Sequence, residues 1–263
     1  MNKQFYLFTV GILCTNILFA QTNLGARLTA MGNNGVAVKD IWGVAANPAS
    51  ITDIPYPTLQ LTHQEHFFTE ALKNQALAFA FPIQRQIIGL HLQRYGISEF
   101  QNIKAGIVLT RQFGQKLAIG LRANYHQLKI SNYGVTKGIS IDVGTIFQFT
   151  DELCFGFYIN NPSKDTYQTK SIYTTLPTTA YLGVAYRTSD KLLVASTIST
   201  DILAIGLDYQ LIKSFSLRGG LSLNPFTHYA GIGFSKSKFI ADFSFTKHPN
   251  FGYSSQLTIG YVF

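Results

Sequence analysis

From residue 56 to its end, the sequence consists of segments of about ten residues in which apolar side chains alternate with polar or small ones. In one segment the apolar positions are Leu117, Ile119, Leu121, Ala123 and Tyr125. Successive side chains of a β-strand point to opposite faces of its sheet, so a period of two predicts strands. Because the pattern recurs throughout this region, we expect an all-β fold.

Alternation alone does not distinguish a soluble sheet from a membrane barrel. The second face of these segments is rich in Gly, Ser, Ala and Asn, and charged residues are only 13% of the chain, about half the usual quarter. Small residues suit a crowded barrel interior, and an apolar outer face suits lipid. Aromatic residues near the segment ends are typical of interfacial girdles. The alternative, in which they form the core of a soluble sandwich, is less favoured.

We therefore predict a transmembrane antiparallel β-barrel of about fourteen strands over residues 56–263. The predicted strands are 57–67, 76–83, 87–95, 102–112, 116–128, 138–149, 153–160, 178–188, 191–199, 202–211, 214–223, 226–234, 238–246 and 253–263. An even number is typical of single-chain bacterial barrels, and closure leaves no strand edge unpaired in lipid. The two longest predicted connections, 129–137 and 161–177, fall on the side opposite to the termini, as expected for outer loops.

The first twenty residues have the composition of a secretory signal peptide. Lys3 provides the positive start, residues 5–13 form an apolar run, and Ala20 is a small residue suited to cleavage. The alternative is a buried N-terminal helix or strand. Removal of residues 1–20 would take Cys14 with it and leave Cys154 as the sole cysteine, so no intramolecular disulfide is expected. We predict export and a place in the bacterial outer membrane.

Residues 21–55 do not alternate, and we expect them to form an N-terminal plug or hatch inside the barrel. The segment is rich in glycine, and Pro48 and Pro55 resist strand pairing. The alternative is a periplasmic tail with a turn motif.

The last predicted strand ends on the outward pattern Leu257, Ile259, Tyr261 and Phe263. A terminal Phe on an alternating strand resembles the signal read by the barrel-insertion machinery of the outer membrane. We therefore expect these four residues to direct barrel assembly.

Five charged residues fall on the predicted inward face, namely Arg122, Asp142, Asp208, Arg218 and Asp242. Buried charges must be paired or hydrated. We expect these to pair with one another or with the plug, in preference to lining a water path.

No catalytic, metal or cofactor site is expected. The sequence contains no G-x-S-x-G, H-E-x-x-H or Walker motif. His91 and His126 face the predicted lumen, where either can pair with Ser140 or Asp142, but a structural polar network is the favoured interpretation over catalysis. The net charge of +8 comes from scattered Lys and Arg, so nucleic acid is not expected as a partner, whereas outer-membrane lipid and lipopolysaccharide are.

The N-terminal segment carries a family resemblance. Its residues include Gly25-Ala26-Arg27, Met31-Gly32, Val36-Ala37-Val38, Asp40, Trp42 and Asn47-Pro48-Ala49-Ser50-Ile51. This run resembles the N-terminal signature of the FadL-type long-chain fatty acid transporters and the related PorV/PorQ-type proteins of Bacteroidetes. Ser50 and Ile51 stand where that signature has Gly and Leu, and the Asp40–Trp42 spacing is more similar to the PorV/PorQ branch.

The resemblance implies a fourteen-stranded barrel with an N-terminal plug. Its candidate functional residues are Arg27, Asp40, Trp42, Asn47, Pro48 and Ala49. The PorV/PorQ branch implies an accessory protein of type IX secretion that binds secretion-system proteins. The alternative is a plugged channel for the uptake of small hydrophobic molecules such as fatty acids.

Overall fold

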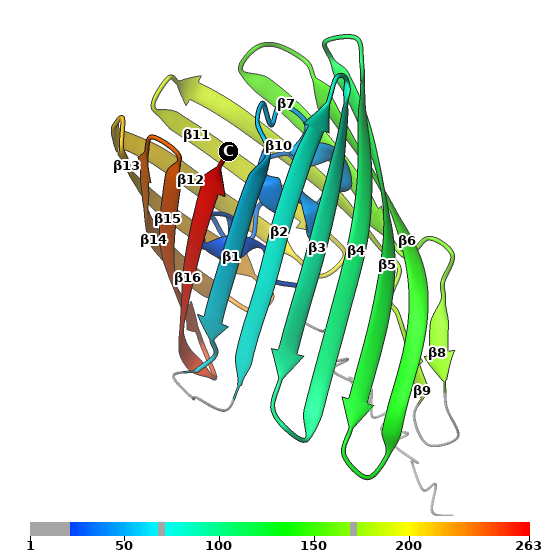
Figure 1. The fold of residues 1–263 in the computed structure, drawn as a ribbon. Helices are drawn as coiled ribbons and strands as arrows, with labels where there is room; N and C mark the ends of the chain where they lie inside the picture. The colour runs from blue at the N-terminus through cyan, green and yellow to red at the C-terminus, as the bar shows by residue number, and fades with distance from the viewer. Residues whose placement is uncertain (1–21, 68–71, 169–172) are drawn as a thin grey trace, which may run out of the picture.

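The computed structural model describes residues 22–67, 72–168 and 173–263, in which fourteen antiparallel strands close into a barrel (Figure 1). Strands β1 to β7 follow one another around the wall, β10 to β16 continue it, and β16 pairs with β1. The predicted fold class is confirmed. The predicted signal peptide, residues 1–20, lies outside the described residues.

Each predicted strand corresponds to one strand of the wall. The wall consists of β1 (Thr58–Glu65), β2 (Lys73–Ile83), β3 (Gln86–Gly96), β4 (Phe100–Phe113), β5 (Leu117–Ile130), β6 (Gly134–Gln148), β7 (Leu153–Asn160), β10 (Thr179–Ser189), β11 (Leu192–Ser199), β12 (Leu203–Ile212), β13 (Phe215–Leu223), β14 (Thr227–Lys236), β15 (Phe239–His248) and β16 (Gly252–Val262). Two further strands, β8 (Thr166–Gln168) and β9 (Tyr173–Thr175), pair with each other between β7 and β10. Three residues are too few to show a period of two, which explains why the sequence predicted only a loop there.

The two faces of the wall differ in the way that the alternation predicts. Outward-facing side chains such as Ile107 and Ile139 are 62% and 67% exposed, whereas the inward-facing Val108 and Ser140 are buried. A slip of one residue between strands would exchange the faces. Soluble proteins rarely expose an apolar surface that is continuous around the molecule, so this exterior suits lipid. Among the described residues, no helix is long and apolar enough to cross a membrane.

The two ends of the barrel differ in their connections. At one end, here called the turn end, the connections are residues 84–85, 114–116, 149–152, 190–191, 213–214 and 237–238. The C-terminus lies at this end, where the backbone N–H of Phe263 donates to the carbonyl of Pro57 at 2.9 Å (Figure 1). At the opposite end, the loop end, the connections are residues 66–72, 97–99, 131–133, 161–178, 200–202, 224–226 and 249–251.

Residues 22–55, here called the inner segment, lie inside the barrel (Figure 1, blue). They contain helix α1 (Gly25–Ala30) and the 3-10 turns η1 (Ile41–Val44) and η2 (Pro48–Ile51). The side chains of Leu28 and Met31 are fully buried, so the main apolar core is formed between this segment and the wall.

Candidate functional site in the barrel interior

Two capped turns give the inner segment its shape. The carboxylate of Asp40 accepts a hydrogen bond from the backbone N–H of Trp42 (2.8 Å) and caps η1. The side-chain oxygen of Asn47 accepts one from the backbone N–H of Ala49 (3.0 Å) and caps η2. Pro48 occupies the first position of η2, where a missing N–H is tolerated. These five residues of the N-terminal signature therefore define the local conformation.

A chain of charged groups joins α1 to the wall. Arg27 lies 2.7 Å from a carboxylate oxygen of Asp40 and 3.0 Å from one of Asp208 on β12. Asp208 also contacts Arg218 on β13 at 3.2 Å, and Arg218 contacts Asp242 on β15. Burial acts to lower the pKa of Arg27, but the two neighbouring carboxylates outweigh it and raise the pKa above its usual value. Arg27 is thus a permanent cation that bridges the inner segment and the wall.

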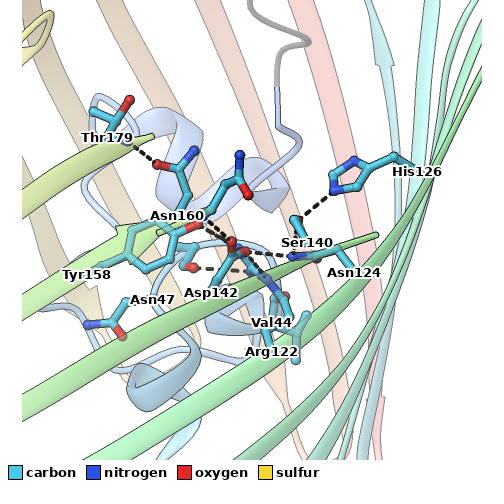
Figure 2. A network of polar contacts seen from close by, with 12 residues as sticks. Val44, Asn47, Arg122, Asn124, His126, Ser140, Asp142, Tyr158, Asn160 and Thr179 are labelled. Atoms are coloured by element: carbon cyan, nitrogen blue, oxygen red, sulfur yellow. Dashed lines mark hydrogen bonds and ion pairs between the residues drawn. The ribbon is translucent and has the colours of Figure 1, made fainter. Parts of the chain in front are cut away.

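A second attachment centres on Arg122 of β5, which is fully buried (Figure 2). Its guanidinium donates two hydrogen bonds to Asp142 on β6, at 2.9 and 2.6 Å. It donates two more to the carbonyls of Val44 and Ala46 in the inner segment, at 2.7 and 3.1 Å. The other oxygen of Asp142 accepts from the backbone N–H of Asn161 (2.9 Å). A buried ion pair is stable when its remaining donors and acceptors are satisfied, and carbonyls of the inner segment complete this one.

The polar network continues from this pair toward the loop end. Asn124 donates to Asp142 at 2.7 Å and to Ser140 at 3.3 Å. Nε2 of His126 lies 2.8 Å from Oγ of Ser140 (Figure 2). His91, by contrast, is fully buried and its ring nitrogens have no hydrogen-bond partner among the described residues. The contact between His126 and Ser140 is one link in a hydrogen-bonded network whose main attachment is Arg122.

Asn47 also fixes the inner segment directly against the wall. Its side-chain amide donates to the carbonyls of Val36 (2.7 Å) and of Thr145 on β6 (3.0 Å). The approach is so close that a Cβ at Gly144 would lie 1.9 Å from the Asn47 side-chain oxygen. Glycine is therefore required at this point of the wall.

The same close approach recurs around the barrel. At eight inward-facing glycines, an added Cβ would come within 3.0 Å of an atom of the inner segment. These are Gly89 on β3, Gly120 on β5, Gly144 on β6, Gly156 on β7, Gly183 on β10, Gly206 on β12, Gly220 on β13 and Gly231 on β14. We call them the wall glycines. Small residues on this face were predicted from the sequence, but these glycines were not identified individually. The recurrence of glycine at inward positions of successive strands is the signal that could have identified them.

Trp42 packs between the inner segment and the seam where β1 meets β16. Its side chain is 1% exposed, and the indole N–H donates to the side chain of Gln60 at 2.6 Å. Gly25, at φ +70°, makes room for the ring, since a Cβ there would lie 2.2 Å from the indole nitrogen. The backbone N–H of Ala26 donates to Thr258 on β16 (2.8 Å).

The four residues predicted to direct assembly lie apart from this interior site. Leu257, Ile259 and Phe263 are 51%, 54% and 55% exposed, and Tyr261 lies beside Phe263. Their role in assembly stays a prediction.

The fold and the site together define a class: a closed barrel with an apolar exterior whose interior is filled by its own N-terminal segment. No family model matches the chain. No curated protein matches it either.

Solved structures do share the fold. The toluene transporter TbuX of Ralstonia pickettii is 13% identical, with a TM-score of 0.68 over 94% of this chain and 100% of that chain. The toluene transporter TodX of Pseudomonas putida is 12% identical, with a TM-score of 0.69 over 92% and 99%. A FadL homologue of Pseudomonas aeruginosa is 11% identical, with a TM-score of 0.68 over 91% and 98%. The chain therefore has the barrel fold of FadL-type transporters of bacteria.

Proposed function

We propose that the chain is an outer-membrane channel for small hydrophobic molecules, with the inner segment as its plug. The observation that carries the proposal is the filled interior: the inner segment contacts the wall glycines on eight strands. A porin for polar solutes has an open, water-filled lumen, which this arrangement does not provide. The likeness in fold to two toluene transporters supports a hydrophobic substrate.

The sequence favoured a type IX secretion accessory of PorV/PorQ type as the first interpretation, and the comparisons favour the channel instead. The feature behind that interpretation was the Asp40–Trp42 spacing. Both side chains are buried within the barrel, where Asp40 pairs with Arg27 and Trp42 contacts Gln60. They are therefore accounted for by packing of the inner segment and present no surface to a secretion partner.

A reversible disulfide between the inner segment and the wall tests the proposal that the chain is a channel. Cγ1 of Val44 lies 2.7 Å from the position of a Cβ at Gly89, so cysteines at these two positions are close enough to form a disulfide. Cells that express V44C/G89C are compared with cells that express each single variant, and uptake of radiolabelled toluene is measured before and after oxidation. We expect oxidation to stop uptake in the double variant only, and a reductant to restore it.

Two results would contradict the proposal. Uptake no faster than in cells lacking the chain would exclude a channel for this substrate class. Uptake that persists with the disulfide formed would exclude a path past the inner segment. Native mass spectrometry of protein extracted from its own membrane distinguishes the channel from the secretion accessory. A bound apolar small molecule supports the channel, and a stoichiometric protein partner supports the secretion role.

A further inference from the structure

Basic residues gather at the turn end of the barrel. Five of the six turns there contain an exposed lysine or arginine: Arg85, Lys116, Lys191, Lys213 and Lys238. Three more lie on strands within three residues of these turns: Arg111, Arg187 and Lys236. The acidic residues of the turns are three, Asp151, Glu152 and Asp190. Eight cations thus face three anions.

At the loop end, counted in the same way, the numbers of cationic and anionic residues are nearly equal. Its described cations are Lys73, Arg94, Lys129, Lys164 and Lys247. Its described anions are Glu65, Glu99, Asp165 and Asp201. The positive charge of the described residues is therefore concentrated at one end of the barrel, whereas a scattered distribution was predicted from the sequence.

Two basic residues of the turn end lie over aromatic rings. The guanidinium of Arg111 lies over the ring of Phe113 at 5.5 Å, and the ammonium of Lys238 lies over the ring of Tyr261 at 5.7 Å. Phe149 and Phe239 are 56% and 64% exposed at the same end. Aromatic rings at a membrane boundary lie at the level of the lipid headgroups, so these contacts place the cations at that level too.

We propose that the turn end binds the headgroups of anionic phospholipids, whose phosphodiesters the exposed lysines and arginines contact. The inference rests on the membrane location in the proposed function but not on transport. A basic residue near an anionic membrane surface contributes about 1 kcal/mol, or roughly fivefold in affinity. Several lysines distributed around the rim then select anionic over zwitterionic lipid, and they orient the turn end toward the leaflet that holds phospholipid.

The test compares two matched quadruple variants of the full chain. The variant K116Q/K191Q/K213Q/K238Q removes four cations from the turn end, and K73Q/K129Q/K164Q/K247Q removes four from the loop end. Each protein is reconstituted in nanodiscs of mixed phosphatidylglycerol and phosphatidylcholine, and native mass spectrometry counts the lipids of each kind retained after release. Far-UV circular dichroism and Trp42 emission establish that each barrel is folded.

We expect the unaltered chain and the loop-end variant to retain phosphatidylglycerol preferentially, and the turn-end variant to lose at least about tenfold of that preference. Inorganic phosphate should displace the lipid no more than chloride does at equal ionic strength. If the turn-end variant does not fold, the pairs K116Q/K191Q and K213Q/K238Q should each give a smaller loss. Equal retention of both lipids by the unaltered chain, or an equal loss in the loop-end variant, would overturn the proposal. This experiment does not measure toluene uptake. Failure of the lipid-binding proposal can therefore be distinguished from failure of the channel proposal.

Discussion

Replacement of Arg122 by Met should loosen the inner segment before it unfolds the wall. The substitution keeps an apolar stem but leaves the buried carboxylate of Asp142 without its cation, and it leaves the carbonyls of Val44 and Ala46 without their donor. Breaking a buried ion pair costs about 3–5 kcal/mol. The lost hydrogen bonds to Val44 and Ala46 fall on the inner segment, so we expect that segment to detach at a lower denaturant concentration than the strands.

The protein carries its own reporter for this experiment. Trp42 is the only tryptophan in the sequence and lies in the inner segment with 1% of its surface exposed. Its emission therefore follows the inner segment, while far-UV circular dichroism follows the strands. Urea titration of the folded barrel should give coincident transitions for the unaltered chain, and an earlier fluorescence transition for R122M.

Two controls show whether the reasoning is correct. Arg94→Met removes an exposed arginine and should change the free energy of unfolding by less than about 0.5 kcal/mol. Adding D142L to R122M should recover part of the loss, because an apolar pair replaces an unpaired charge. Loss of a buried ion pair predicts a decrease of several kcal/mol in the free energy of unfolding. A decrease of under about 1 kcal/mol in R122M would therefore refute this explanation. Coincident fluorescence and circular dichroism transitions in R122M would refute it as well.

Three further changes test other contacts. Gly144→Val forces a side chain into the space of Asn47, so the tryptophan emission should shift to longer wavelength, and an unchanged spectrum would show that the contact is not tight. Arg27→Met leaves the largely buried Asp40 without its cation and should lower the midpoint of the fluorescence transition by the equivalent of about 1–2 kcal/mol, measured against the exposed-site control Lys39→Met. Burial lowers the pKa of His66 to about 4, so the native state resists protonation. The free energy of unfolding should therefore fall as the pH drops from about 6.5 toward 4, with His66 contributing on the order of 3 kcal/mol, and His66→Phe should remove that contribution and leave a shallower pH dependence in urea titrations at several pH values.

The strands could be predicted from the sequence wherever the outward face and the inward face of a strand have different surroundings. Predicted and observed bounds of β7 are identical, and β5 differs by one or two residues at either end. The largest differences occur at the loop end, where β2 begins at Lys73 rather than residue 76 and β6 at Gly134 rather than residue 138. Lys73, Asn74 and Gln75 are polar on both faces, so they show no alternation although they continue the ladder.

The interior site was only partly predictable. The charges on the inward face follow from alternation, and the cross-strand register places Arg122 opposite Asp142 and Asp208 opposite Arg218. The contacts of Arg122 with the inner segment could not be predicted, because no periodic pattern determines the path of that segment. Tyr158, whose hydroxyl accepts a hydrogen bond from Arg122 at 2.7 Å, was not predicted for a related reason. Alternation places its side chain on the inward face but does not identify the residue that it contacts.

The wall glycines have a mechanical consequence. Each glycine admits an atom of the inner segment at one position along its strand, and the next inward position often carries a side chain, such as Arg122 after Gly120 on β5 or Ile146 after Gly144 on β6. Displacement along the barrel axis would bring the segment against those side chains, so the glycines fix its depth in the barrel. The force needed to withdraw the segment should thus be highest at the start, when these contacts and the bonds of Arg122, Arg27 and Asn47 are lost together.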